Sequence, residues 1–228
     1  MEKITITVGV KKIEVSARYS NKTTRTKIKV SHTGEVELVV PERTSLTKAK
    51  EFLLTNLAWV THKIEAIKNV KAPRNQIPIF GELHKIEHTE SYNQLFVRSG
   101  AGKIFVSCPG SMQKQMITEY LKDLFFSEIK RLVREISKEH RFHVNKIQIK
   151  DHKSKWGSCS SKQNLSFNWK LVFAPHHVIR YLVVHELCHL KEMNHSKKFW
   201  NLVGRIDPNY SASRSWLRKN SVLLHSYL

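Results

Sequence analysis

Cysteines and long apolar runs are both scarce in this sequence. Its three cysteines, Cys108, Cys159 and Cys188, are odd in number, widely spaced and outside any CxxC pair. This pattern argues against a disulfide framework and against a cysteine-rich zinc ribbon. No window approaches the roughly 18 apolar residues of a membrane helix, and the first residues alternate like a strand without an apolar signal core. We therefore expect a cytoplasmic protein with no membrane partner.

Acidic residues are also few. The 228 residues include 19 Asp and Glu against 39 Lys and Arg, which gives a formal net charge of +20. Such a field attracts polyanions, so nucleic acid, nucleotides or an acidic partner are plausible. The alternative is a solubilising surface in a lysine-rich protein. Hydrophobic and charged contents of 40% and 25% are those of an ordinary soluble protein, and the length allows one large domain or two small ones.

Hydrophobic periodicity predicts an α+β chain in two parts. Strand-like alternation between Ile4 and Val40 suggests an antiparallel meander, and apolar residues at intervals of three and four predict one helix over about 45–70. Further short strands precede Cys108, and a long helix follows from about Ser111 to His140. We place a boundary between an N-terminal β-rich region, 1–109, and a metal-hydrolase domain, 110–228. Within the second part, the strand 164–169 is a candidate edge strand for an extended peptide.

The segment His185-Glu186-Leu187-Cys188-His189 carries the clearest chemical signal. Histidines four residues apart on a helix lie on the same face, so both imidazoles can reach one metal ion while Glu186 projects beside them. A metal lowers the pKa of a bound water, and a carboxylate takes the proton as that water attacks. The alternative is two unrelated histidines on a structural helix. We interpret the segment as a zinc hydrolase site.

A zinc site needs a third protein ligand, and several residues are candidates. His195 lies six residues after His189, far enough for the chain to leave the helix and turn back. Glu192 lies three residues after His189 and would stay near the same face of a continuing helix. His152 or His143 would have to approach through tertiary folding. We favour His195, with the alternative that it merely caps the next helix.

A loop ahead of the helix contains Lys153, Lys155, Gly157 and Ser158, which we predict to contact substrate. Glycine there would let a substrate approach, backbone amides would hold an oxyanion, and the lysines would receive an anionic group. The structural alternative is that Trp156 fills the core while Gly157 makes a turn.

Three segments together resemble a known family. They are Lys155-Trp156-Gly157-Ser158-Cys159-Ser160, Asn168-Trp169-Lys170, and HELCHLKEMNHSKKFW ending at Trp200. They are similar to the YgjP-like metallopeptidase domain family, which is grouped with gluzincin-like and SprT-like zincins. The resemblance implies a zincin-like fold with a small antiparallel sheet and an active-site helix. It also implies one Zn2+ per chain on His185, His189 and His195, with Glu186 as the catalytic base.

These observations favour a zinc-dependent metallopeptidase in which Glu186 activates a zinc-bound water. One alternative is a metal-dependent nucleoside triphosphate (UTP) pyrophosphatase, since family members are sometimes described this way and the basic charge suits a polyanion. A further alternative is a SprT-like protease associated with nucleic acid through the basic surface. Candidates for the group that stabilises the reaction's oxyanion are Tyr181, Tyr210 and Arg180.

Overall fold

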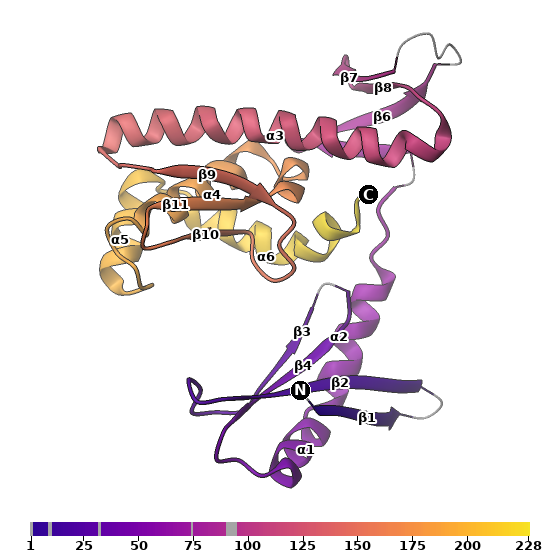
Figure 1. The fold of residues 1–228 in the computed structure, drawn as a ribbon, viewed down its shortest axis with the longest axis vertical. Coiled ribbons are helices and arrows are strands. Elements are labelled where there is room, and N and C mark those ends of the chain that lie inside the picture. The colour runs from indigo at the N-terminus through magenta and orange to yellow at the C-terminus, as the bar shows by residue number, and fades with distance from the viewer. Residues whose placement is uncertain (1, 9–10, 32, 74, 90–94) are drawn as a thin grey trace. The chain divides into compact units, whose positions relative to one another are not determined.

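The computed structural model describes residues 2–8, 11–31, 33–73, 75–89 and 95–228 (Figure 1). The chain forms two compact units, Met1–Lys71 and Ala72–Leu228. The division therefore falls at residue 71 rather than near the predicted 109. The reason is that Ile77, Ile104 and Val106, which precede the predicted boundary, are buried in the same core as the helices that follow it.

The N-terminal unit is a four-stranded sheet with two helices. Its strands are β1 (Glu2–Val8), β2 (Lys11–Ser20), β3 (Lys27–Val30) and β4 (Val36–Pro41), in the order β1-β2-β4-β3. Strands β2 and β4 pair in parallel, so the predicted antiparallel meander is wrong. β3 occupies the outer edge and pairs only with β4 among the described strands, which leaves β4 beside β2.

The helix predicted over 45–70 is two helices, α1 (Leu46–Thr55) and α2 (Leu57–Asn69). They meet at Asn56, whose backbone N–H donates to the Leu53 carbonyl oxygen at 3.2 Å. Its side-chain amide donates to the Phe52 carbonyl oxygen at 2.8 Å. Because asparagine competes for backbone groups in this way, the helix ends and restarts there. Leu53 and Val60 of the two helices are fully buried in this unit's core.

The second unit begins with another four-stranded sheet. Its strands are β5 (Gln76–Ile79), β6 (Glu82–His88), β7 (Phe96–Gly100) and β8 (Lys103–Ser107), in the order β5-β6-β8-β7. The β5–β6 turn touches the start of the motif-bearing helix. Gly81 has φ +89°, and a Cβ placed on it would lie 2.9 Å from Pro175 Cα. Glycine therefore allows both the turn and the close approach.

The remaining elements are a three-stranded sheet and the helices around it. They are α3 (Gly110–His140), β9 (Lys146–Lys150), β10 (Gly157–Cys159), β11 (Asn164–Asn168), the 3-10 helix η1 (Trp169–Phe173), α4 (His176–Cys188), α5 (Lys197–Ile206) and α6 (Tyr210–Ser226). The sheet order is β10-β11-β9, so β11 is central and the prediction that residues 164–169 form an edge strand is wrong. The edge strands are β9 and β10, because each pairs with β11, and β10 does so in antiparallel orientation. The α+β fold class is confirmed, but β9 pairs with β11 in parallel, so the small sheet is mixed and not antiparallel as predicted.

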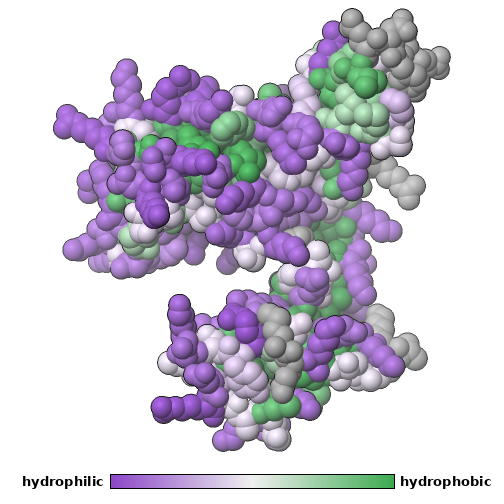
Figure 2. All heavy atoms as spheres, viewed as in Figure 1, coloured by the Kyte–Doolittle hydropathy of each residue, from purple (hydrophilic) through white to green (hydrophobic). Residues whose placement is uncertain are grey.

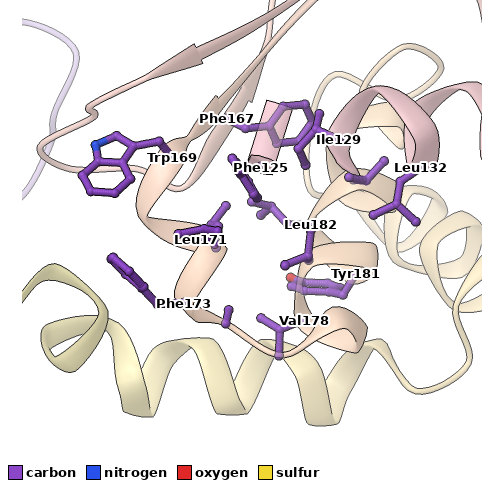
Figure 3. Close-up of a cluster of buried hydrophobic side chains, with 14 of the residues drawn as sticks. Phe125, Ile129, Leu132, Phe167, Trp169, Leu171, Phe173, Val178, Tyr181 and Leu182 are labelled. Atoms are coloured by element: carbon purple, nitrogen blue, oxygen red, sulfur yellow. The ribbon is translucent and has the colours of Figure 1, made fainter. Parts of the chain in front are cut away.

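Helix α4 lies in the core of this unit. Figure 3 shows Phe125 of α3, Leu171 of η1 and Leu182 of α4 pointing toward one another. Nine of the 13 residues of α4 are buried. Burial on several sides fixes the helix axis, and with it the direction of the motif side chains at its C-terminal end. Among the residues that the structure describes, no helix combines the length and apolar character needed to cross a membrane.

Candidate metal centre

Three histidines converge at the C-terminal end of α4. His185 lies in the last turn of the helix, His189 is its C-cap residue, and His195 immediately precedes Ser196, the N-cap of α5. One nitrogen from each ring lies within 4.8 Å of the others. The Nε2 atoms of His185 and His195 are 3.1 Å apart. The three side chains can therefore hold one metal ion.

The return of the chain between α4 and α5 is built from short-range hydrogen bonds. The N–H groups of Lys191 and Glu192 both donate to the Cys188 carbonyl oxygen, at 3.1 and 2.9 Å. Asn194 Oδ1 then accepts from the Ser196 N–H at 3.1 Å, and Ser196 Oγ caps α5. The side chain of Asn194 thereby ends the turn, so that His195 comes back toward the helix.

Two aromatic residues of α5 form a wall behind the histidines. The Phe199 ring stacks on His189 with centroids 4.6 Å apart and lies 4.9 Å from His185. The Trp200 ring stacks on His195 at 5.7 Å. Phe199 is fully buried. The wall fixes the planes of the imidazoles, and the sequence had indicated these two residues only as apolar positions of a short helix.

The electrostatics favour the neutral form of His185 and His195, which is the form that binds a metal. Burial lowers the pKa of His185 to about 3, and the neighbouring rings His189 and His195 act in the same direction. Burial, with His189 and Arg214 adding to it, also lowers the pKa of His195.

The hydrogen bonds leave nitrogen lone pairs for a metal. His189 Nδ1 lies 3.1 Å from the Glu192 carbonyl oxygen and donates to it, so Nε2 keeps its lone pair. His185 Nδ1 is buried and has no hydrogen-bond partner among the described residues. The Nε2 atom of His185 faces the Nε2 atom of His195. Three imidazole nitrogens with this arrangement fit a metal ion.

Glu186 is buried beside the histidines, with 4% of its surface exposed. Burial raises its pKa to about 8, while the ammonium of Lys155 acts in the opposite direction. A Cβ on Gly157 would lie 2.5 Å from Glu186 Oε1. The glycine of β10 is thus required for space rather than for a turn, and the carboxylate fits against bare backbone.

The other predicted site residues are spread more widely. Lys155 acts on Glu186 electrostatically, Ser158 pairs with Ser166 inside the β10–β11 ladder, and Lys153 is exposed with no contact to the histidines. Trp156 stacks on His225 with centroids 4.5 Å apart, so it is packed, as the structural alternative held.

None of the alternative third ligands brings a side-chain ligand atom into the group formed by the three histidines. Glu192 reaches His189 through its backbone carbonyl and not through its carboxylate. His152 Nε2 is 2.8 Å from Ser166 Oγ. His143 lines a groove of about 870 Å³ between α3 and the start of β9, over which Figure 2 shows an apolar area.

The candidate oxyanion donors differ in their distance from the histidines. The Tyr181 ring lies 5.9 Å from that of His185, and Tyr210 stacks on Trp200 at 5.5 Å. Arg180 is half-buried on α4 and does not belong to the group of side chains that converge at the centre among the described residues. Cys188 is buried in the core, and burial raises the pKa of its thiol to about 12. Cys188 therefore packs as a small apolar residue.

Sequence reasoning missed Arg214. Its guanidinium carbon lies 4.5 Å from the centroid of Trp200, on whose ring His195 also stacks. Its charge contributes to the lowered pKa values of His185 and His195. Arg214 belongs to α6, and the sequence carries no signal that brings this helix beside α4.

Comparisons with known proteins agree with this geometry. A family model described as "YgjP-like, metallopeptidase domain" matches residues 24–220. The UTP pyrophosphatase of Escherichia coli (strain K12) is 42% identical over 53 residues, which are 22% of this chain and 32% of that protein. The chain therefore spans about a third of the length of this relative.

Two solved structures are similar to part of this chain. The metallopeptidase zymogen of Methanocaldococcus jannaschii jannalysin is 28% identical, with a TM-score of 0.36 over 40% of this chain and 95% of that one. The metallopeptidase zymogen of Pyrococcus abyssi abylysin is 18% identical, with a TM-score of 0.37 over 40% and 93%.

Proposed function

The chain belongs to the YgjP-like metallopeptidase domain family, and from that premise we propose that it is a zinc-dependent hydrolase of the metallopeptidase type. One zinc per chain would be held by His185, His189 and His195. The observation that carries the proposal is the convergence of three imidazole nitrogens within 4.8 Å, next to the buried carboxyl group of Glu186. Three protein ligands are the usual number for a catalytic zinc, which keeps a further position for water or substrate.

Zinc, when bound, supplies Lewis acidity that lowers the pKa of water and polarises an oxygen of the substrate. Glu186 accepts the water proton at a carboxylate oxygen and returns it to the leaving group. Burial raises the pKa of this group, so its ionised form is a stronger base than an exposed carboxylate. Gly157 leaves the space in which this carboxyl group sits.

Tyr181 is the proposed donor to the developing oxyanion. Burial raises the pKa of its hydroxyl to about 12, so the group keeps its proton at neutral pH. In support of this role, its ring lies 5.9 Å from that of His185, and the residue lines the pocket between α4 and α6. A preorganised donor of this kind contributes a rate factor of about 10²–10³.

An extended peptide would bind along β10. Among the described strands, β10 pairs only with β11, so its second edge is open, and it begins at Gly157 beside Glu186. Backbone hydrogen bonds to an open strand edge supply affinity without sequence preference. A peptide added there would pass the carboxyl group that activates the water.

A second candidate function is hydrolysis of a nucleoside triphosphate to release pyrophosphate. The segment that is 42% identical to a UTP pyrophosphatase favours it, as does the net charge of +20. Glu186 would play the same part, with the water directed at phosphorus rather than at a carbonyl carbon. Association with nucleic acid through the basic surface, as in a SprT-like protease, is a further proposal that rests on charge alone.

The test offers the purified protein casein-like peptides and a panel of nucleoside triphosphates that includes UTP, with Glu186→Gln as the inactive variant. Glu192→Gln is the matched control, because Glu192 contributes only its backbone carbonyl to the centre. We expect turnover of one substrate class, lost in the first variant and kept in the second. Turnover that persists in Glu186→Gln would refute the assigned base.

A further inference from the structure

A pocket of about 350 Å³ lies between α4 and α6. Its volume is within the range of small-molecule sites. It is formed by the loop before β10, by α4 and by one face of α6, and its lining consists of Trp156, Tyr181, Leu182, Arg214, Leu217, Arg218 and Ser221. The four residues from α6 are spaced by three, one and three, which places them on a single helical face. We call this the α6 pocket.

The α6 pocket carries two guanidinium groups and no carboxylate. Arg214 and Arg218 are both exposed, and neither forms an ion pair with a carboxylate in the described ranges. Two like charges one helical turn apart repel each other unless an anion lies between them. Their guanidinium forks match the oxygens of phosphoryl and carboxylate groups. Hydroxyl groups of Tyr181 and Ser221 add donors to the same lining.

The pocket is one residue layer away from the metal-binding side chains. Tyr181, which lines it, lies 5.9 Å from His185 between ring centroids. Arg214 lies over the ring of Trp200, on which His195 also stacks. Trp156 directly precedes Gly157, against which Glu186 packs. A group bound in the pocket would therefore lie beside the bond that Glu186 and the histidines act on.

We propose that the α6 pocket is a subsite for a phosphoryl group of the substrate, held by Arg214 and Arg218. A terminal phosphoryl group carries up to two charges and three oxygens, which match two guanidinium forks and a hydroxyl, whereas a carboxylate offers one charge and two oxygens. Catalysis on such a substrate rests on the proposed function of the His185–Glu186 site. Anion binding by itself does not, which allows the two to fail separately.

The test measures binding of inorganic pyrophosphate to the full chain by titration calorimetry. It is carried out in the His195→Ala background, so that a metal does not contribute to the signal. We expect Arg214→Gln and Arg218→Gln each to weaken binding by about tenfold or more, the usual loss for a charged hydrogen-bonding partner. The matched control is Lys219→Gln, which removes the same charge from the next residue of α6, outside the pocket lining, and should change binding less than about twofold.

Two outcomes would overturn the proposal. Equal weakening in Arg218→Gln and Lys219→Gln would mean that pyrophosphate senses only the general positive field. Tighter binding of an acidic peptide than of pyrophosphate, lost in Arg218→Gln, would make the pocket a carboxylate subsite. If Arg214→Gln lowers the melting temperature because its contact with Trp200 is structural, Arg218→Gln decides alone, since that side chain is exposed.

A separate measurement keeps the proposed function apart. If Glu186→Gln retains hydrolysis while pyrophosphate binding still depends on Arg218, the assigned catalytic base is wrong and the phosphoryl subsite stands. If Glu186→Gln abolishes peptide hydrolysis and no Arg variant changes pyrophosphate binding, the base stands and the subsite is wrong.

Discussion

Replacing Gly157 by alanine tests the arrangement around Glu186 directly. The added Cβ would lie 2.5 Å from Oε1, 2.8 Å from Cγ and 2.9 Å from Cδ of Glu186. Three atoms of one buried side chain are affected, so rotation of a single atom cannot relieve the clash. Restoring ordinary van der Waals contact requires the carboxyl group to move by about 1 Å. The three nearest atoms all belong to Glu186, so we expect the histidines to keep their positions.

A displacement of this size has calculable consequences. Misplacing a reacting group by about 1 Å costs on the order of 10²-fold in rate, which is about 2.7 kcal/mol of transition-state stabilisation. Overpacking in the core costs a further 1–3 kcal/mol or so of folding stability. For a unit of this size, that corresponds to a melting temperature lower by roughly 2–4 °C for each kcal/mol.

The assay compares kcat/KM, zinc content and melting temperature in Gly157→Ala and in the control Gly100→Ala. A Cβ on Gly100 meets nothing within 4 Å, and this residue lies in the same unit. We expect Gly157→Ala to lose about 10²-fold in kcat/KM while keeping its zinc, and Gly100→Ala to keep both. Unchanged kcat/KM in Gly157→Ala would refute the reasoning that the glycine positions the carboxyl group.

Two further perturbations follow from the same contacts. Phe199→Ala should lower the free energy of unfolding by about 3–5 kcal/mol and weaken zinc binding, because a fully buried ring that stacks on His189 is removed; unchanged zinc affinity in a folded variant would contradict the role of the aromatic wall. Glu128 accepts hydrogen bonds from Arg131, which lowers its pKa, and its Oε1 lies 3.2 Å from His176 Nδ1 at the start of α4. A group with a lowered pKa in the folded state stabilises the protein above its unfolded-state pKa, and this stability is lost as the pH falls through its folded-state pKa. Glu128→Gln should therefore destabilise the protein by up to about 1 kcal/mol at pH 7 and by nothing in strong acid, as measured by chemical denaturation at several pH values. A constant difference at all pH values would contradict this origin.

Much of the candidate site was accessible from the sequence because its signals are local. The separation of four residues between His185 and His189 places both side chains on one face by helical geometry alone. The approach of His195 was also predictable, since the five positions between His189 and His195 suffice for a chain to reverse. Its role as a ligand stays a prediction, although the distances among the three rings support it.

Pairings distant in sequence could not be predicted in the same way. The parallel pairing of β2 with β4 and the central place of β11 depend on which strand edges meet in space, and alternation along one strand says nothing about its neighbours. The unit boundary at residue 71 likewise depends on Ile77 and Ile104 sharing a core with α3. The predicted meander and the predicted boundary both assumed that segments adjacent in sequence also pack together.

The surroundings of the site were the least predictable part. Gly157 was expected to admit substrate or to make a turn, whereas its place against Glu186 follows from the packing of β10 on α4. Arg214 reaches the histidines only because α6 returns across Trp200. A single arginine within a basic chain carries no distinguishing pattern, so only the fold could indicate it.

Zinc content per chain, measured by elemental analysis of the purified protein and matched variants, tests the central claim most directly. We predict about one zinc per chain in the unaltered protein, loss of zinc in His195→Ala, and retention in Glu192→Ala, because Glu192 meets the centre through its backbone carbonyl alone. Absence of zinc from the unaltered protein, or its loss in Glu192→Ala with retention in His195→Ala, would contradict the account.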